Sequence, residues 1–246
     1  MSWDKFSQIY RWEMEFANPN QLQDEKFWFE LAKETGGPIL DIAAGDGRIT
    51  KSLLKTGFQV TALELSKKMI EKLQLINDEN LTIVNADMKN FNLETRFNLI
   101  VVGYFSFQQI LNLEEQIQFL KNIKKHLTKN GILGIDIYPC VCEGNDESQM
   151  KMIYKRKYEN NIVEMYSSYK IDRLDLIKYW KDFYRITSLS TKESIEFYNE
   201  IALKECSPDY MNLLFAKADL KIVAKYGSFN KDVVTQNSEN IIYLLK

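Results

Sequence analysis

Residues 38–64, PILDIAAGDGRITKSLLKTGFQVTALE, decide the fold of this chain. Residues 38–42 form a short apolar run, which predicts a strand buried on both faces of a parallel sheet. The small residues 43–47 predict a sharp turn that a ligand can approach closely. A helix is expected over residues 48–55, with Gly57 as its cap. Residues 58–63 then predict a second strand, which ends at Glu64.

Glu64 follows Gly45 by 19 residues (64 − 45). A nucleotide-binding unit places an acid at about this spacing, where it binds the ribose hydroxyls. The alternative is a plain strand–helix–strand unit in which the small residues only pack the helix on the strand. The turn lacks the pattern Gly-x-Gly-x-x-Gly, and Asp41 and Asp46 would repel phosphate. A pyrophosphate cofactor is therefore disfavoured.

The pattern Asp41-x-Ala43-x-Gly45-x-Gly47 resembles the first motif of class I S-adenosylmethionine-dependent methyltransferases, D/E-x-G-x-G-x-G. Ala43 replaces the first glycine and leaves less room beside the methionine end of the cofactor. The resemblance implies that residues 43–47 cradle the aminoacyl part of S-adenosylmethionine and that Glu64 binds the ribose diol. A sulfonium cofactor carries no phosphate, which suits the acidic turn. The resemblance extends over residues 1–137 and 207–246, roughly.

Other cofactor contacts are implied by the same resemblance. Tyr10 lies in WDKFSQIYRW, which resembles the helix that folds over the cofactor in this family; core packing is the alternative role. Asp87, after a predicted strand over 81–85, matches the acid that meets the adenine amine, although it could also cap a turn. The predicted cofactor-binding set is Tyr10, Asp41, Ala43, Gly45, Gly47, Glu64, Leu65, Ala86, Asp87, Met88 and Gly103.

The acceptor side is predicted from YFSFQQ, which follows an apolar strand over residues 97–103. It resembles F-N-S-F-x-H-L in a branch that includes small-molecule N-methyltransferases, with Gln109 in place of the usual histidine. Tyr104, Ser106 and Gln109 are the predicted catalytic residues. The single histidine, His126, precedes a helix end, where the helix dipole favours a cation. No metal site is predicted.

Periodicity predicts the rest of the architecture. Helices are expected in residues 1–35, with a break at 18–20, and over 67–76, with Ser66 as N-cap, and 113–127. A turn at 130–131 precedes a strand over 132–137, and strands over 220–228 and 240–245 follow a helix that begins near 207. The predicted fold class is α/β, a doubly wound, mostly parallel seven-stranded sheet of the Rossmann-like type.

Residues 150–204 alternate with a period of two and are rich in Tyr and Trp. They predict an antiparallel β cap of three or four strands over the site. Residues 1–149 and 205–246 are expected to form the cofactor-binding domain, and 150–204 the substrate lid.

Composition limits the function. The 246 residues carry a net charge of −2, with a pI near 5.7, so affinity for nucleic acid through phosphate neutralisation is not expected. No apolar run is long enough to span a membrane. Three cysteines without metal spacing indicate reduced thiols and a cytoplasmic location, and a homodimer is left open.

The sequence thus predicts an S-adenosylmethionine-dependent methyltransferase acting on a small molecule, with an amine nitrogen favoured as acceptor. O-methylation of a small metabolite is the main alternative, followed by an RNA methyltransferase and a non-catalytic cofactor-binding module.

Overall fold

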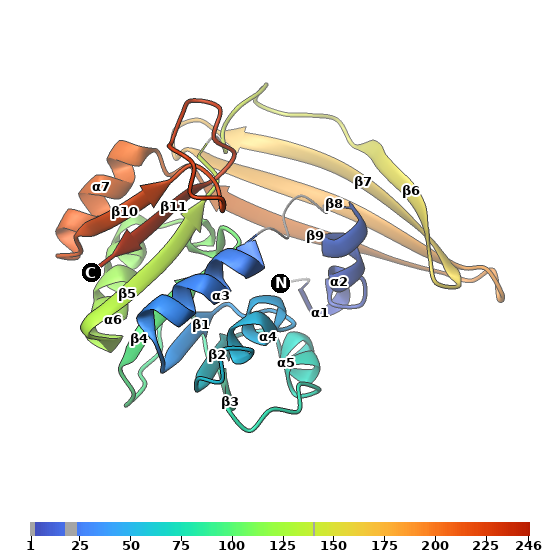
Figure 1. The fold of residues 1–246 in the computed structure, drawn as a ribbon. Coiled ribbons are helices and arrows are strands. Elements are labelled where there is room, and N and C mark those ends of the chain that lie inside the picture. The colour runs from blue at the N-terminus through green and yellow to red at the C-terminus, as the bar shows by residue number, and fades with distance from the viewer. Residues whose placement is uncertain (1–2, 18–23, 140) are drawn as a thin grey trace.

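A seven-stranded sheet forms the centre of the protein (Figure 1). The structure, a computed structural model, describes residues 3–17, 24–139 and 141–246. Its strand order is β10-β11-β5-β4-β1-β2-β3, with β11 antiparallel to both neighbours. The strands are β1 (Ile39–Ile42), β2 (Val60–Glu64), β3 (Leu81–Asn85), β4 (Phe97–Val102), β5 (Leu127–Ile137), β10 (Ile222–Tyr226) and β11 (Ile241–Leu245). The predicted doubly wound, mostly parallel sheet is confirmed.

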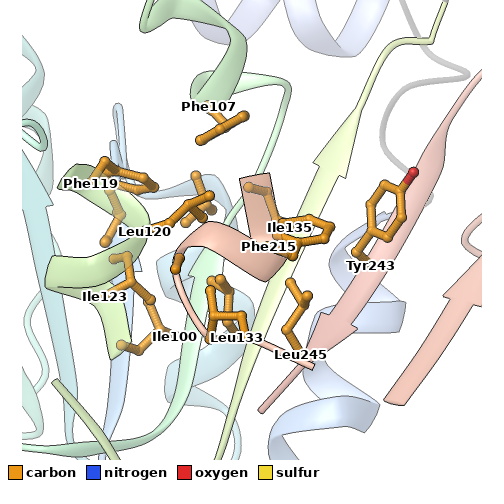
Figure 2. Close-up of a cluster of buried hydrophobic side chains, with 14 of the residues drawn as sticks. Ile100, Phe107, Phe119, Leu120, Ile123, Leu133, Ile135, Phe215, Tyr243 and Leu245 are labelled. Carbon is orange, nitrogen blue, oxygen red and sulfur yellow. The ribbon is translucent and has the colours of Figure 1, made fainter. Parts of the chain in front are cut away.

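Helices cover both faces of this sheet, which is why its central strands are mostly apolar. On one face lie α3 (Asp24–Thr35), α4 (Arg48–Leu54) and α5 (Lys67–Leu73), and on the other α6 (Leu113–His126) and α7 (Pro208–Lys217). Figure 2 shows Phe119 of α6 and Phe215 of α7 in the second layer, beside Leu133 of β5. Each such buried side chain contributes about 1.5–3 kcal/mol.

The predicted helix caps are in place. The Ser66 hydroxyl accepts from the backbone N–H of Met69, and the Ser207 hydroxyl accepts from that of Tyr210. Gly57 follows α4 with φ +78°, as predicted for a left-handed cap.

The turn predicted at residues 130–131 is wrong. Strand β5 begins directly after α6 and includes both residues. Phe97 pairs with Leu127 but Leu99 pairs with Ile132, so the irregularity is a shift in strand register. A Cβ at Gly131 would come within 2.7 Å of the Phe97 carbonyl oxygen. The glycine therefore marks a close approach of two strands rather than a reversal of the chain.

The N-terminal segment is divided into short pieces instead of one helix: α1 (Trp3–Phe6), α2 (Tyr10–Trp12) and a π-helical turn (Glu13–Ala17). The break predicted at residues 18–20, like Cys140, lies outside the described residues.

A separate four-stranded antiparallel sheet follows β5, as the alternation predicted. It consists of β6 (Lys151–Tyr158), β7 (Asn161–Asp172), β8 (Ile177–Ser188) and β9 (Ser194–Lys204). Figure 1 shows this cap sheet arching over α1 and α2. Phe6, Ile9 and Trp12 pack against Tyr184 and Phe197 of the cap sheet. The N-terminal segment is therefore held between the two sheets.

Candidate active site

A cavity of about 520 Å³ lies where the carboxyl ends of β1 to β4 meet. This is the edge of an open α/β sheet at which ligands bind, and the volume is in the usual range for a small-molecule site. Of the predicted site residues, the cavity brings together Tyr10, Ala43, Gly45, Glu64, Leu65, Ala86, Asp87, Met88, Tyr104, Ser106 and Gln109.

The turn between β1 and α4 exposes its backbone to this cavity. Ala43, Gly45 and Gly47 have φ values of +56°, +59° and +86°. This left-handed conformation suits the two glycines, whereas at Ala43 it is strained. A Cβ on Gly45 would lie 3.7 Å from the Tyr10 hydroxyl oxygen, so Tyr10 sits directly over the turn.

Glu64 joins two loops of the cavity wall. Its Oε2 accepts from the Gly45 N–H at 2.8 Å, and its Oε1 accepts from the Ser66 N–H at 2.8 Å. The side chain is buried. Each carboxylate oxygen can accept a further hydrogen bond, so the group remains able to bind a vicinal diol.

Three predicted residues lie behind the cavity wall. Asp41 is buried and accepts from the Thr50 hydroxyl at 2.6 Å. Burial raises the pKa of Asp41 to about 7. Added Cβ atoms on Gly47 and Gly103 would meet the side chains of Leu73 and Ile49 within 2.7 Å, so these glycines allow close helix–strand packing.

A strained turn after β4 presents Tyr104 and Ser106. Tyr104 and Phe105 have φ values of +54° and +57°. The Asp136 carboxylate on β5 accepts from both of their N–H groups, at 2.9 and 3.3 Å. Ser106 donates through Oγ to the Gly103 carbonyl oxygen at 2.7 Å. Asp136 thus fixes the turn, and burial raises its pKa to about 7.

The Arg48 guanidinium lies against one face of the Tyr104 ring. The guanidinium centre lies 5.8 Å from the ring centroid, and its two terminal nitrogens donate to the two oxygens of buried Asp24. The ion pair thus fixes the position of Arg48 beneath the ring.

Some residues of the site were not predicted. Asp46, expected to repel phosphate, accepts two hydrogen bonds of 2.8 Å from Arg11. Asp4 accepts from the Ser66 hydroxyl at 2.6 Å and lines the cavity. These contacts join positions 35 and 62 residues apart, and no local pattern signals them. Lys67 and Lys89 also line the cavity; each directly follows a predicted site or cap residue.

His126 is not the cation that the helix end suggested. Its Nε2 accepts from the Leu93 N–H at 3.0 Å, and its Nδ1 lies 2.8 Å from the Asn122 carbonyl oxygen. An imidazole that accepts at Nε2 and donates at Nδ1 is neutral. The ring is buried against Phe91 and has a packing role.

No group of three or more His, Cys, Asp or Glu among the described residues is arranged to hold a metal ion. None of the helices in residues 3–17, 24–139 and 141–246 is long and apolar enough to cross a membrane.

Comparison with known proteins agrees with this geometry. Residues 39–131, from β1 into β5, match the model of a methyltransferase domain family. These residues carry a methyltransferase domain, and the fold is that of class I S-adenosylmethionine-dependent methyltransferases. An S-adenosylmethionine-dependent methyltransferase from Clostridium acetobutylicum ATCC 824 superposes with a TM-score of 0.82 at 20% identity, covering 100% of this chain and 99% of that one.

Two further proteins resemble this chain. The sugar N-methyltransferase KedS8 from Streptoalloteichus sp ATCC 53650 has a TM-score of 0.73 at 16% identity, covering 97% of this chain and 91% of KedS8. YqeM of Bacillus subtilis (strain 168), described as a methyltransferase, is 26% identical over 141 residues, which are 56% of each chain. The chain thus spans about half of that relative's length. It spans 20% and 42% of the lengths of two other curated relatives that it matches.

S-adenosylmethionine is the cofactor that the methyltransferase domain implies, and the cavity fits it. Glu64 offers acceptor oxygens for a ribose diol. Asp87 accepts from the Lys89 N–H through Oδ1, which leaves Oδ2 for an exocyclic amine. Asp4, Glu64 and Asp87 all line the cavity, and their carboxylates suit a cationic sulfonium. When bound, the cofactor supplies an electrophilic methyl group on sulfur.

Proposed function

We propose that this protein transfers a methyl group from S-adenosylmethionine to a small molecule enclosed beneath the cap sheet, with an amine nitrogen as acceptor. The observation that carries the proposal is the position of Tyr104, Ser106 and Gln109, which line the same cavity as Glu64 and the turn after β1. Methyl transfer from a sulfonium requires mainly alignment and exclusion of water. A fixed turn and a covering sheet supply both.

Enclosure supports a small acceptor. The N-terminal segment lies over the turn after β1 and packs under the cap sheet, so it covers part of the site. We include in the proposal that residues 150–204 act as the lid, that the acceptor is not a nucleic acid, and that the protein works in the cytoplasm. A homodimer is compatible with these expectations, and sedimentation at several protein concentrations tests it.

An amine acceptor is supported by the ring systems near the site. Tyr104 and Phe105 stack at 5.5 Å, and Tyr138 lies 6.0 Å from Phe105. Aromatic faces attract cations, which favours an acceptor that arrives as an ammonium. KedS8, which shares the fold, is a sugar N-methyltransferase.

The test is transfer of labelled methyl groups into an extract of the source cells, fractionated by size and salt-titrated. We expect label in the small-molecule fraction, weakly dependent on ionic strength. Label in RNA or protein would contradict the small-molecule acceptor, and product chemistry separates N- from O-methylation. S-adenosylhomocysteine should bind in calorimetry; binding without any transfer would indicate a non-catalytic cofactor-binding protein.

Variants locate the acceptor within the same assay. Tyr104→Phe and Ser106→Ala should lower the transfer rate while the dissociation constant of S-adenosylhomocysteine stays within about twofold. Tyr179→Phe, at an exposed tyrosine of the cap sheet, is the matched control and should change neither quantity. Unchanged rates in both site variants would place the acceptor elsewhere.

A further inference from the structure

One row of polar residues interrupts the face of the cap sheet that packs against the N-terminal segment. Paired residues on neighbouring strands point to the same side, so Ser167, Asp182 and Asn199 share the face of Tyr184 and Phe197. Val163, Tyr184 and Phe197 on this face are buried in a hydrophobic cluster with the N-terminal segment. Asp182 is only 8% exposed and accepts from the Ser167 hydroxyl at 2.6 Å. A carboxylate buried in such a face has a large desolvation cost, which stability alone does not explain.

A second buried acid faces the cap sheet from the N-terminal segment. Glu13 is 5% exposed, and its Oε2 accepts from the Tyr154 hydroxyl of β6. Among the described residues this is the only hydrogen bond to the Glu13 carboxylate, as the bond from Ser167 is the only one to Asp182. One oxygen of each buried carboxylate therefore has no hydrogen-bond donor from these residues.

Neither acid lines the cavity; the N-terminal segment and the cap sheet connect them to its wall. A chain of ring contacts runs from Tyr10 on the cavity wall to Phe6 (5.8 Å) and on to Tyr184 (5.4 Å), two residues from Asp182. Burial raises the pKa of Tyr184, and the charges of Glu13 and Asp182 raise it further. Burial also raises the pKa of Tyr104, with Glu13 among the nearby charges that raise it. The charge of Glu13 therefore acts on both Tyr104 and Tyr184, and that of Asp182 acts on Tyr184.

We propose that Glu13 and Asp182 bind the protonated amine of the acceptor and select cationic acceptors over neutral ones. The inference rests on the proposed methyltransferase function and names its substrate class. The free oxygens of the two carboxylates supply hydrogen-bond acceptors for the N–H groups of an ammonium, and their charges compensate its own. The cost of burying the acids is then recovered in substrate binding.

The same pair accounts for the proton that must leave before methyl transfer. An ammonium has no lone pair, so one N–H proton passes to a carboxylate, giving a neutral amine and a carboxylic acid. The amine nitrogen forms a bond to the methyl carbon as the carbon–sulfur bond breaks, with the electron pair going to sulfur. The new N-methylammonium keeps its positive charge, and the carboxylic acid returns its proton to water.

The environment of the pair prepares it for this exchange. Burial raises the pKa of Glu13 to about 7, with the charge of Asp182 adding to the effect while the Tyr154 hydrogen bond and Arg156 oppose it. Burial raises the pKa of Asp182 to about 6, opposed by the Ser167 hydrogen bond. A base in this range accepts a proton near neutral pH more readily than an ordinary carboxylate.

The experiment uses two isosteric variants of the full chain. Asp182→Asn retains an oxygen for the Ser167 hydroxyl, and Glu13→Gln retains one for that of Tyr154. Each should lower kcat/KM for the acceptor by at least about 30-fold, mainly through KM. The control is Glu164→Gln, which changes a buried acid on the opposite face of the cap sheet that pairs with Lys155 and Arg185.

The probe is the small-molecule fraction of the source-cell extract, separated by cation exchange before incubation with labelled methyl donor. We expect label in the retained, cationic fraction, lost in Asp182→Asn and Glu13→Gln but kept in Glu164→Gln. The dissociation constant of S-adenosylhomocysteine should stay within about twofold in all variants. Wild-type kcat/KM should fall as the pH drops below about 7, because Glu13 and then Asp182 become protonated and no longer attract an ammonium.

Other outcomes separate the two proposals. Label in the neutral or anionic fraction, or cationic labelling that both variants leave intact, would overturn the acid pair and leave the methyltransferase proposal standing. A fall in thermal midpoint with unchanged KM would show that the acids only hold the cap sheet to the N-terminal segment. No label in any small-molecule fraction would overturn both.

Discussion

At the scale of single residues, Glu64 has two roles, of which the sequence predicts only one. It is predicted to bind the ribose hydroxyls, and in the structure it also holds two loops of the cavity wall together. Its distance from Gly45 predicts an acid at the end of the second strand, because strand, turn and helix lengths are nearly constant in this unit. The structure adds that both carboxylate oxygens already hold backbone N–H groups of the cavity wall. No sequence pattern shows such bonds, since they depend on the final position of two loops. Glu64 therefore shapes the cavity before any ligand binds.

Glu64→Gln tests both roles. The amide nitrogen of glutamine cannot accept, so it must face the Gly45 or the Ser66 N–H group and leave that donor unsatisfied. We expect binding of S-adenosylhomocysteine to weaken by about 1.5–3 kcal/mol in calorimetry, since charge-assisted bonds are lost. The thermal midpoint without ligand should fall as well. Glu71→Gln, at an exposed acid of α5 paired with Lys68, is the control. An unchanged dissociation constant would make Glu64 purely structural.

At the scale of elements, the N-terminal segment links the two sheets. Its polar side binds the site through Arg11 and Asp4, and its apolar side packs under the cap sheet. The periodicity of apolar residues in the sequence predicted the strands and most helices. Both faces of the main sheet and one face of the cap sheet are buried, and their burial requires apolar residues at regular spacing. The segment itself was predicted poorly, since short helical pieces held by contacts distant in sequence have no period of their own.

The pair Arg11–Asp46 should control how long the cofactor stays bound. Asp46 is buried and Arg11 partly exposed, with two hydrogen bonds between them. We expect Asp46→Asn and Arg11→Met each to raise the dissociation rate of S-adenosylhomocysteine about 5- to 30-fold, seen by stopped-flow tryptophan fluorescence. The double variant should be no worse than either single one, giving a coupling energy of about 1–2 kcal/mol. Additive effects would mean that the two residues act separately.

At the scale of the whole molecule, buried acids are concentrated around the site. Burial raises the pKa of Asp41, Asp136 and Glu13 to about 7 and that of Asp182 to about 6. The architecture could be predicted from the sequence because apolar periodicity determines it. The free-energy cost of burying these carboxylates could not be predicted from the sequence. It depends on which carboxylates lose contact with water when the main sheet, the N-terminal segment and the cap sheet pack together.

Stability should therefore fall as the pH rises through neutrality. Each raised pKa means that the native state keeps a proton that the unfolded chain has released, between about pH 4 and the native value. The stabilisation is complete below that range and is lost as the pH passes about 7. In urea unfolding at constant ionic strength, we expect a lower midpoint at pH 8 than at pH 6, with the slope unchanged.

Asp41→Asn isolates one of these groups. Asparagine has the same shape and keeps an oxygen for the Thr50 hydroxyl, but it has no charge to desolvate. The variant should gain about 1–3 kcal/mol at pH 8 and little at pH 4, so its pH dependence should be flatter than that of the wild type. A gain of equal size at both pH values would assign the effect to packing. A loss at pH 8 would mean that the ionised Asp41 stabilises the native state, contrary to what the burial of its carboxylate implies.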